Sequence, residues 1–519
     1  MSEPLPALAY AFAKHQGVVL LALGARARVG LREDADPVVL LEVRRSLGVE
    51  LDVEVLPRSV FDCRLSELYA DAAMAGAGGE LDLPGDLDAL AGDIPATADL
   101  LDAQDDAPVI RLINGLIAEA ARIGASDVHI EPFESGLVVR MRVDGVMREA
   151  LRLPGRIAPL LVSRVKVMAR LDIAEKRLPQ DGRIGLTMGS KALDVRVSTL
   201  PARGGERVVM RILDKDQGTL TLEGLGMQAH VLEALRRALR QPNGIVLVTG
   251  PTGAGKTTTL YSALASLNDG RRNILTVEDP VEYAIDGVGQ TQVNARVGMS
   301  FATGLRAILR QDPDVVMVGE VRDPETAQIA VQASLTGHLV LSTVHTNDAP
   351  GAVTRLRDMG IEPFLLASSL RLVLAQRLLR RLCTACREPV TGEGRTSALR
   401  LLVAGRDAHR VGSVADANVN ADVDADTNID ATLYRATGCA LCSHTGYAGR
   451  LGIHEALEID ERLRQLIGGN ADEDALAAAA FAGGQRLGDA ARAAVLRGET
   501  TLEEAMRVTR QELQDHGGV

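Results

Sequence analysis

A glycine-rich segment in the middle of the chain constrains the fold more than any other part of the sequence. Residues 250–257 read Gly-Pro-Thr-Gly-Ala-Gly-Lys-Thr, which fits the phosphate-binding pattern GxxxxGK followed by Ser or Thr. The apolar run at residues 245–249 is typical of the buried strand that precedes such a loop. Glycines let the backbone curl so that successive N–H groups point at phosphate oxygens, and the helix expected near Lys256 adds its positive end. The segment therefore predicts a nucleoside triphosphate site in an α/β core.

The side chains of this loop have distinct expected roles. Lys256 would neutralise the outer phosphates, and the Thr257 hydroxyl would ligate Mg²⁺. ATP and Mg²⁺ are therefore the expected ligands. The residues predicted to bind the nucleotide are Gly250, Pro251, Thr252, Gly253, Ala254, Gly255, Lys256, Thr257 and Thr258, with Arg306 and Arg310 from a later helix.

A second apolar strand, at residues 314–318, leads into Gly319 and Glu320. This is the Walker B arrangement of a P-loop protein, with glycine where aspartate usually stands. Mg²⁺ would then rest mainly on Thr257, the phosphates and water, which leaves Glu320 free to polarise the attacking water. The alternative is a buried strand that ends in an ordinary surface acid.

A third strand, at residues 274–278, also ends in acidic residues. Ligands of doubly wound sheets bind at the carboxyl ends of the strands, so Glu278 is predicted to face the same pocket as Glu320 and to share in catalysis. Asp279 and Glu282 flank Pro280. They either join this acidic group or belong to a simple turn.

Histidine and arginine side chains complete the candidate catalytic set. His345 follows the strand at residues 339–344, from where it could hydrogen-bond the γ-phosphate and report hydrolysis; a structural histidine is the alternative. Arg306 and Arg310 share one helix face, where like charges repel unless an anion or acidic partner lies between them. They are interpreted as contacts to phosphate or to another subunit, with a solvated face as the alternative.

Four of the five cysteines occur as two CxxC pairs, Cys383 with Cys386 and Cys439 with Cys442. Four thiolates suit a closed, tetrahedral structural Zn²⁺ site. Disulfides are the alternative, which a reducing cytosol disfavours. The fifth, Cys63, is expected to pack as a small buried residue.

The segment between the two cysteine pairs contains an acidic, low-complexity tract at residues 413–432. Its run from Asp422 resembles a calcium loop, but Thr427 occupies the obligatory glycine position and Leu433 the glutamate position. A solvated, disordered insertion is therefore predicted.

Composition excludes several classes of protein. No apolar run approaches the roughly 18 to 20 residues that span a bilayer, and the first residues lack the pattern of a secretory signal. A cytoplasmic location is expected, with any membrane attachment peripheral. The net charge of −12 and the 2% of aromatic residues argue against nucleic acid as a partner.

The 519 residues exceed what one core can organise. The predicted fold is an α/β P-loop ATPase core preceded by an α+β domain and a small N-terminal α/β domain, with a Cys₄ zinc-binding subdomain after the core. The predicted boundaries are 1–75 for the N-terminal domain, 76–106 for a flexible acidic linker, 107–215 for the second domain, 216–380 for the core, 381–455 for the zinc-binding subdomain with its insertion at 413–432, and 456–519 for a helical region.

The loop, the acidic segment at Glu278, the glycine-variant Walker B element and the His345 strand occur in an order that resembles the secretion ATPases of type II and type IV secretion and of pilus assembly. Four further segments are similar to the type II secretion assembly ATPases, the general secretory pathway protein E family. They lie at residues 125–133, 171–183, 195–201 and 205–213.

The resemblance implies that the core is RecA-like and that the α+β second domain is PAS-like. It also implies a hexameric ring of identical subunits in which ATP is held between the second domain and the core. Arg196 and Arg211 would then reach phosphate from the second domain, together with Arg306 and Arg310. The N-terminal domain would bind the cytoplasmic domain of an inner-membrane secretion protein. The zinc-binding subdomain would face the inner-membrane platform protein, so the subunit would be attached peripherally to that membrane.

The main hypothesis is an ATP-hydrolysing motor that assembles a pseudopilus and so exports proteins by type II secretion. A type IV pilus assembly ATPase is the alternative within the same class. A nucleic-acid translocase, which would use a similar core to move along nucleic acid, is a second alternative. The missing Walker B aspartate suggests a third, a zinc-stapled scaffold that binds nucleotide without hydrolysing it.

Overall fold

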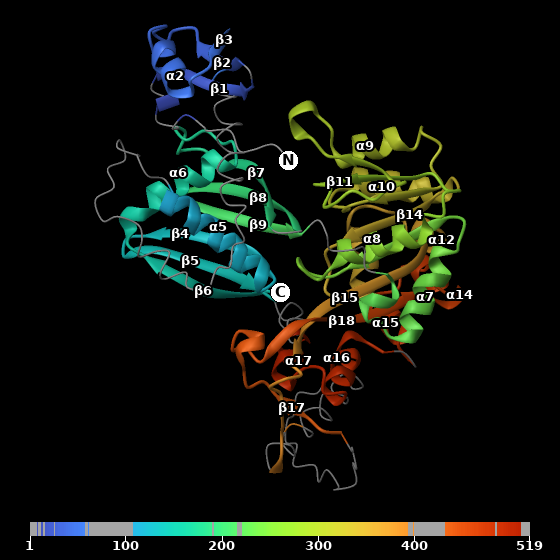
Figure 1. Ribbon diagram of the computed structural model, residues 1–519. Coiled ribbons are helices and arrows are strands. Elements are labelled where there is room, and N and C mark those ends of the chain that lie inside the picture. The colour runs from blue at the N-terminus through green and yellow to red at the C-terminus, as the bar shows by residue number, and fades with distance from the viewer. Residues whose placement is uncertain are drawn as a thin grey trace. The chain divides into compact units, whose positions relative to one another are not determined.

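The computed structural model of the protein is shown in Figure 1. It describes residues 16–24, 26–57, 107–188, 191–214, 221–392, 431–482 and 485–509, together with 8, 12, 13, 61 and 398. Cys63, the linker predicted at 76–106 and the insertion predicted at 413–432 lie outside the described residues. Two compact units divide the chain between Gln217 and Gly218, close to the boundary at 215 that the sequence predicts.

The N-terminal part of the first unit contains a small three-stranded sheet in the order β1-β2-β3. Strands β1 (Val18–Leu23) and β2 (Arg26–Arg32) are antiparallel, and β3 (Glu50–Leu56) runs parallel to β2 after helix α2 (Val39–Leu47). Buried valines of β1, β2 and α2 form its core. This is the small α/β domain that the sequence predicts.

The second part of the first unit is an antiparallel six-stranded sheet in the order β6-β5-β4-β9-β8-β7. Alternate side chains of its strands pack with helices α5 and α6 in one core. The turn between β5 and β6 uses Asp144 and Gly145, both at positive φ (48° and 81°), which confirms the predicted hairpin. The elements are α5 (Ala107–Arg122), β4 (Ala125–Phe133), β5 (Gly136–Val143), β6 (Val146–Leu153), η1 (Gly155–Ile157), α6 (Ala158–Met168), β7 (Gln180–Met188), β8 (Lys191–Ala202) and β9 (Gly205–Asp214).

The second unit is built on a seven-stranded sheet in the order β12-β11-β13-β14-β10-β15-β18, parallel except for the antiparallel pair β15–β18. Its strands are β10 (Gly244–Thr249), β11 (Ile274–Glu278), β12 (Gly289–Gln292), β13 (Val315–Val318), β14 (Leu339–Val344), β15 (Leu370–Leu382) and β18 (Tyr447–Glu458). Every residue of β10, β13 and β14 is buried, as the apolar runs predict.

Helices cover both faces of this sheet (Figure 1). On one face, Val246 and Val248 pack with α7 and α8; on the other, Ile245 and Leu247 pack with helices α9 to α12. The elements are η2 (Glu223–Leu225), α7 (Ala229–Leu239), α8 (Lys256–Leu267), η3 (Ala295–Val297), α9 (Phe301–Ile308), α10 (Pro324–Leu335), α11 (Ala349–Asp358) and α12 (Pro363–Ser369). Burial of each such valine or leucine contributes about 1.5–3 kcal/mol, so β10 holds the nucleotide loop on a rigid base.

The sheet continues beyond the end of the core that the sequence predicts near residue 380. Strand β18 belongs to the predicted zinc-binding subdomain by residue number, yet it pairs with β15 along most of its length, from Leu372–Glu458 to Leu382–Tyr447. The domain boundaries at 380 and 455 stay predictions, but the core sheet includes strands on both sides of the cysteine pairs. A local pattern does not reveal this pairing, because pairing between distant strands depends on long-range packing.

The C-terminal part holds a two-stranded sheet, a short helix at the second cysteine pair and four helices that pack on the core. These are β16 (Glu388–Pro389), β17 (Tyr434–Arg435), η4 (Ala440–Cys442), α14 (Glu461–Gly468), α15 (Glu473–Ala480), α16 (Leu487–Leu496) and α17 (Leu502–Thr509). No helix within the described ranges combines the length and apolar character needed to cross a bilayer.

Candidate functional site

The nucleotide loop joins β10 to α8 and is built from glycines that no other residue could replace without strain. Gly250, Gly253 and Gly255 have φ values of 144°, 80° and 85°. A Cβ at Gly250 would lie 2.4 Å from the carbonyl oxygen of Gln376, a backbone atom. Helix α8 begins at Lys256, so its positive end is directed at the loop.

Lys256 is folded back onto its own loop. Its Nζ donates to the carbonyl oxygens of Gly250 (2.8 Å) and Pro251 (3.1 Å) and lies 3.3 Å from Nδ1 of His345. Burial lowers the pKa of Lys256 to about 8, while the carboxylate of Glu320 opposes that shift. The ammonium group is therefore hydrogen-bonded to carbonyl oxygens that phosphate oxygens can replace.

Glu320 and His345 meet beside the loop because their strands are neighbours in the sheet. Strand β13 precedes Glu320, β14 precedes His345, and β14 pairs with β10. His345 Nε2 lies 2.9 Å from Glu320 Oε1. Lysine can only donate, so Nδ1 of His345 accepts from Lys256 and Nε2 carries the proton that faces Glu320. The structure brings Lys256, Glu320 and His345 together. Their catalytic roles remain predictions.

Arg322 is a residue of this group that the sequence analysis missed. Its guanidinium lies 2.8 Å from the second oxygen of Glu320, with 63% of the Arg322 side chain exposed and 16% of that of Glu320. The carboxylate is thus held by His345 on one oxygen and Arg322 on the other. The signal was present, because Arg322 follows Glu320 by two residues at the end of the same strand.

Glu278 lies at the end of β11 with both carboxylate oxygens already hydrogen-bonded. Tyr261 donates to one oxygen, and Thr276 (2.5 Å) and Gln290 (3.1 Å) donate to the other. Burial, and then the hydrogen bond to Glu278, raise the pKa of Tyr261, which keeps the phenol protonated as a donor. The Glu278 side chain is 3% exposed, and its hydrogen bond from Tyr261 links β11 to α8. Its catalytic role stays a prediction.

Arg306 lies in the last turn of α9 and Arg310 lies two residues beyond its end, and both are engaged locally. Arg306 forms an ion pair of 2.6 Å with Glu325 at the start of α10, and Arg310 donates to the carbonyl oxygen of Arg306 (2.9 Å). Glu325 is thus an acidic partner of Arg306. Their contact with nucleotide stays a prediction.

Arg196 and Arg211 lie in the first unit, directly opposite each other on the paired strands β8 and β9. Their side chains share one face of the sheet, since cross-strand partners point the same way. Arg211 Nε donates to Asp127 on the neighbouring β4 (3.0 Å). The phosphate contacts of both arginines stay predictions.

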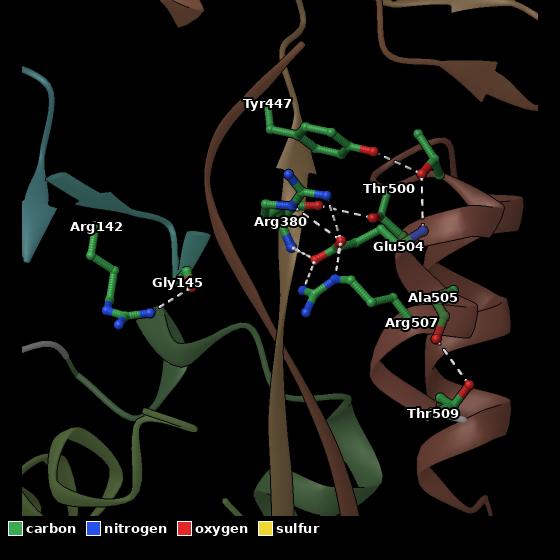
Figure 2. Close-up of polar contacts among 10 residues, drawn as sticks. Arg142, Gly145, Arg380, Tyr447, Thr500, Glu504, Ala505, Arg507 and Thr509 are labelled. Atoms are coloured by element: carbon green, nitrogen blue, oxygen red, sulfur yellow. Dashed lines mark hydrogen bonds and ion pairs between the residues drawn. The ribbon is translucent and has the colours of Figure 1, made fainter. Parts of the chain in front are cut away.

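Strand β15 continues from the core to the first cysteine pair and is tied to the last described helix, α17 (Figure 2). Arg380 of β15 and Arg507 both form ion pairs with the buried carboxylate of Glu504, at 2.8 and 2.6 Å. Burial alone would raise the pKa of Glu504, but the hydrogen bonds from the two arginines outweigh it and lower the pKa to about 2. Arg380 also stacks on the ring of Tyr447, 4.0 Å from its centroid. These contacts fasten the end of β15, next to Cys383, to α17.

The four cysteines of the two CxxC pairs converge on one point, as predicted. Their Sγ atoms all lie within 4.8 Å of one another. The separations are 3.9 Å for Cys383–Cys439, 3.7 Å for Cys386–Cys442 and 3.8 Å for Cys439–Cys442. A tetrahedron with Zn–S bonds of about 2.3 Å has sulfur atoms about 3.8 Å apart, so the cluster fits Zn²⁺.

Backbone donors around the cluster support that assignment. The N–H groups of Cys439 and Gly446 both lie 3.2 Å from Cys442 Sγ. Such donors stabilise a thiolate, which is the form that binds metal. The residues that would hold the ion are Cys383, Cys386, Cys439 and Cys442, and zinc there would fasten two segments of chain that are far apart in sequence.

We expect one tightly bound Zn²⁺ per chain and a C-terminal part that depends on it. Cys383→Ser should lower the melting temperature of this part while ADP affinity stays within about twofold, because structural zinc contributes to folding rather than to the nucleotide loop. Elemental analysis and calorimetry of the purified protein would measure both. His444→Ser, an exposed residue beside the second pair, is the control and should retain the metal. Metal-free fresh protein would contradict the assignment.

Comparisons with known proteins agree with this arrangement. The family described as "Type II/IV secretion system protein" matches residues 102–507, and a family that describes an N-terminal domain of "GSPII protein E" matches residues 7–69. The type II secretion system protein E of Pseudomonas aeruginosa is 51% identical over 99% of this chain and 100% of its own length. The type II secretion system ATPase E of Vibrio cholerae is 53% identical over 91% of this chain and 90% of its own.

A solved structure supports the fold. The DotB ATPase of Legionella pneumophila superposes with a TM-score of 0.54 at 20% identity, covering 79% of this chain and 96% of the other. Likeness at that identity concerns the fold alone, and it agrees with the RecA-like core that the sequence predicts.

Proposed function

This chain belongs to the type II secretion ATPase family, and from that membership we propose that it hydrolyses ATP to assemble a pseudopilus and so export folded proteins. The observation that carries the proposal is the contact chain from Lys256 through His345 to Glu320, set at the mouth of a glycine loop. It combines a phosphate-binding cation with a carboxylate that His345 and Arg322 hold in place beside the loop. Those are the two parts that phosphoryl transfer to water requires.

The chemistry follows from these side chains. Backbone N–H groups of the loop bind the phosphates, and Lys256 exchanges the carbonyl oxygens of Gly250 and Pro251 for phosphate oxygens. Mg²⁺ supplies charge neutralisation when bound, and Thr257 is the residue that would hold it. Glu320 orients the attacking water and accepts its proton, while Arg322 and His345 hold the carboxylate in place.

The finer parts of the proposal concern assembly. Arg196 and Arg211 of the first unit would contact phosphate, with Arg306 and Arg310 from the second, so that hydrolysis requires closure of the two units within a homo-hexamer. The paired positions of Arg196 and Arg211 on one sheet face support this, because a pair of guanidiniums suits an anion. Asp127 keeps Arg211 oriented until the anion arrives.

The N-terminal domain would bind the cytoplasmic domain of an inner-membrane secretion protein, and the match of residues 7–69 to an N-terminal domain of GSPII protein E supports that role. The cysteine cluster would face the membrane platform protein. Through these contacts the subunit would work at the cytoplasmic face of the inner membrane.

The test is stimulation of ATP hydrolysis by the proposed partner. We expect the cytoplasmic domain of the inner-membrane partner, added with vesicles of acidic phospholipid, to raise turnover at least tenfold, while double-stranded DNA leaves it unchanged. Stimulation by DNA that weakens steeply with salt would instead indicate a nucleic-acid translocase. A deletion strain that secretes normally but has lost twitching motility would indicate a pilus assembly ATPase.

A further inference from the structure

Gln376 is a buried polar side chain that contacts the nucleotide loop from outside it. It lies on β15 and is 2% exposed. Its Nε2 donates to the carbonyl oxygen of Ala254 in the loop (2.6 Å), and its Oε1 accepts from the Thr259 hydroxyl on α8 (2.7 Å). Ala254 lies in the predicted nucleotide loop and Thr259 in helix α8, which follows that loop. Gln376 is 122 residues away from Ala254 in sequence.

The chemistry of the partners determines the orientation of this amide. A carbonyl oxygen can only accept, so the NH₂ group of Gln376 must face Ala254. The amide oxygen is then left to accept from Thr259. Thr259 is itself 2% exposed, so neither contact is open to competition from bulk water.

The hydrogen bond to Ala254 has a consequence for the next residue. The Ala254 carbonyl and the Gly255 N–H belong to one planar trans peptide, in which the two groups point in opposite directions. When Gln376 holds the carbonyl toward β15, the Gly255 N–H must point away from β15, toward the side on which this loop collects phosphate oxygens. A Cβ at Gly255 would lie 3.3 Å from Gln376 Nε2, so the peptide and the amide are closely packed.

We propose that Gln376 is a positioning residue for nucleotide binding, which presents the Gly255 N–H to the phosphates, and that Thr259 keeps its amide in the working orientation. The inference rests on the assignment of residues 250–257 as the nucleotide loop. It differs from a purely structural role because it ties the amide to the affinity for phosphate groups and not only to stability.

The first experiment measures phosphate affinity in Gln376→Leu, which removes both hydrogen bonds while keeping an apolar volume. Loss of the donor frees the Ala254 carbonyl to rotate, and we expect Mg²⁺–ADP and inorganic pyrophosphate each to bind about tenfold more weakly, as loss of one hydrogen bond to a charged group predicts. Titration calorimetry on the full chain measures both ligands, and differential scanning calorimetry measures the melting temperature.

Leu374→Ala is the matched control, because Leu374 is buried on the same face of β15, two residues away. It should lower the melting temperature and leave both affinities unchanged. An equal loss of ADP affinity in both variants would overturn the inference in favour of a structural role. Unchanged ADP affinity in Gln376→Leu would overturn it outright, whereas a wild-type chain that binds no ADP would refute the loop assignment instead.

A second variant keeps the shape and tests the donor itself. Gln376→Glu can still accept from Thr259 but cannot donate to Ala254 while ionised. Burial raises the pKa of such a carboxyl, so it takes up a proton as the pH falls from 8 to 6 and can donate again. The ADP affinity of each variant is divided by that of wild type at the same pH, which cancels the titration of Lys256. At pH 6 we expect this ratio to be higher for Gln376→Glu than for Gln376→Leu. A ratio for Gln376→Glu that stays at or below that of Gln376→Leu would contradict the proposal.

Thr259→Val provides the last arm. It removes the hydroxyl that orients the amide, and we expect a smaller loss of ADP affinity than in Gln376→Leu, about threefold. The double variant should then lose no more than Gln376→Leu alone, because the two side chains act as one unit. Additive losses would show that Thr259 acts by a separate route.

Discussion

Lys256→Ala is expected to reduce ATP turnover by at least roughly 10²- to 10³-fold, the scale for removing one preorganised charge from a reacting centre. Lys256 Nζ is held at the mouth of the loop by two carbonyl oxygens and His345, so it is in place before nucleotide arrives. The alanine variant keeps the loop glycines but loses the cation that balances the phosphates. Steady-state phosphate release by the purified full chain measures the effect.

Lys256→Arg is the control for charge, and pH separates binding from catalysis. The pKa of Lys256 is lowered to about 8 in the empty loop by burial, and bound phosphate must raise it again. Wild-type affinity for ADP should therefore be full below pH 8 and should fall as the pH rises above it, since the free ammonium then loses its proton. An arginine stays charged and should abolish that fall. Normal turnover in Lys256→Ala would refute the catalytic assignment of this loop.

Glu320→Gln is expected to lower the turnover number by roughly 10²- to 10⁴-fold while nucleotide still binds, because general-base catalysis contributes on that scale. The amide keeps the shape of the side chain and can still contact Arg322, but it no longer accepts a proton from water. His345 Nε2 would also lose a charged acceptor at 2.9 Å. Calorimetric binding of a non-hydrolysable ATP analogue, beside turnover, separates the two effects.

The control for that substitution is Glu362→Gln, which neutralises an exposed carboxylate just before α12 and away from the loop. Its turnover should match wild type within about twofold. If Glu320→Gln hydrolysed ATP normally, another group would be the base, and Glu278 would be tested next. If the wild-type chain bound ATP without any turnover, the scaffold interpretation would replace the motor.

The strand, loop and helix around Lys256 were predictable because each is encoded locally. An apolar run, three glycines at positive φ and a Lys-Thr helix start are adjacent in sequence, so no distant contact is needed to recognise them. The hairpin at Asp144 and Gly145 was predictable for the same reason. The convergence of the cysteines was also predictable, because metal chemistry restricts how four thiols can be used.

Sequence alone did not predict that both carboxylate oxygens of Glu278 accept hydrogen bonds within the fold. Its position at the end of β11 suggests an open acid, but Tyr261, Thr276 and Gln290 occupy both oxygens. Those donors come from α8, β11 and β12, and their meeting depends on how helix and sheet pack. The contact of Arg322 with Glu320 could have been predicted from the sequence. The contacts of Gln376 could not, because its partners are more than a hundred residues away.

Sequence alone determined that this chain binds a nucleoside triphosphate, that its strands form a parallel α/β core and that four cysteines act together, because these features follow from short-range geometry and from the chemistry of phosphate and thiolate. Tertiary structure decided which side chains surround the loop. It placed His345 between Lys256 and Glu320, added β18 to the edge of the sheet and brought Gln376 into contact with Ala254. The physical reason is that strand order and side-chain burial arise from packing the whole core, and no single segment contains that information.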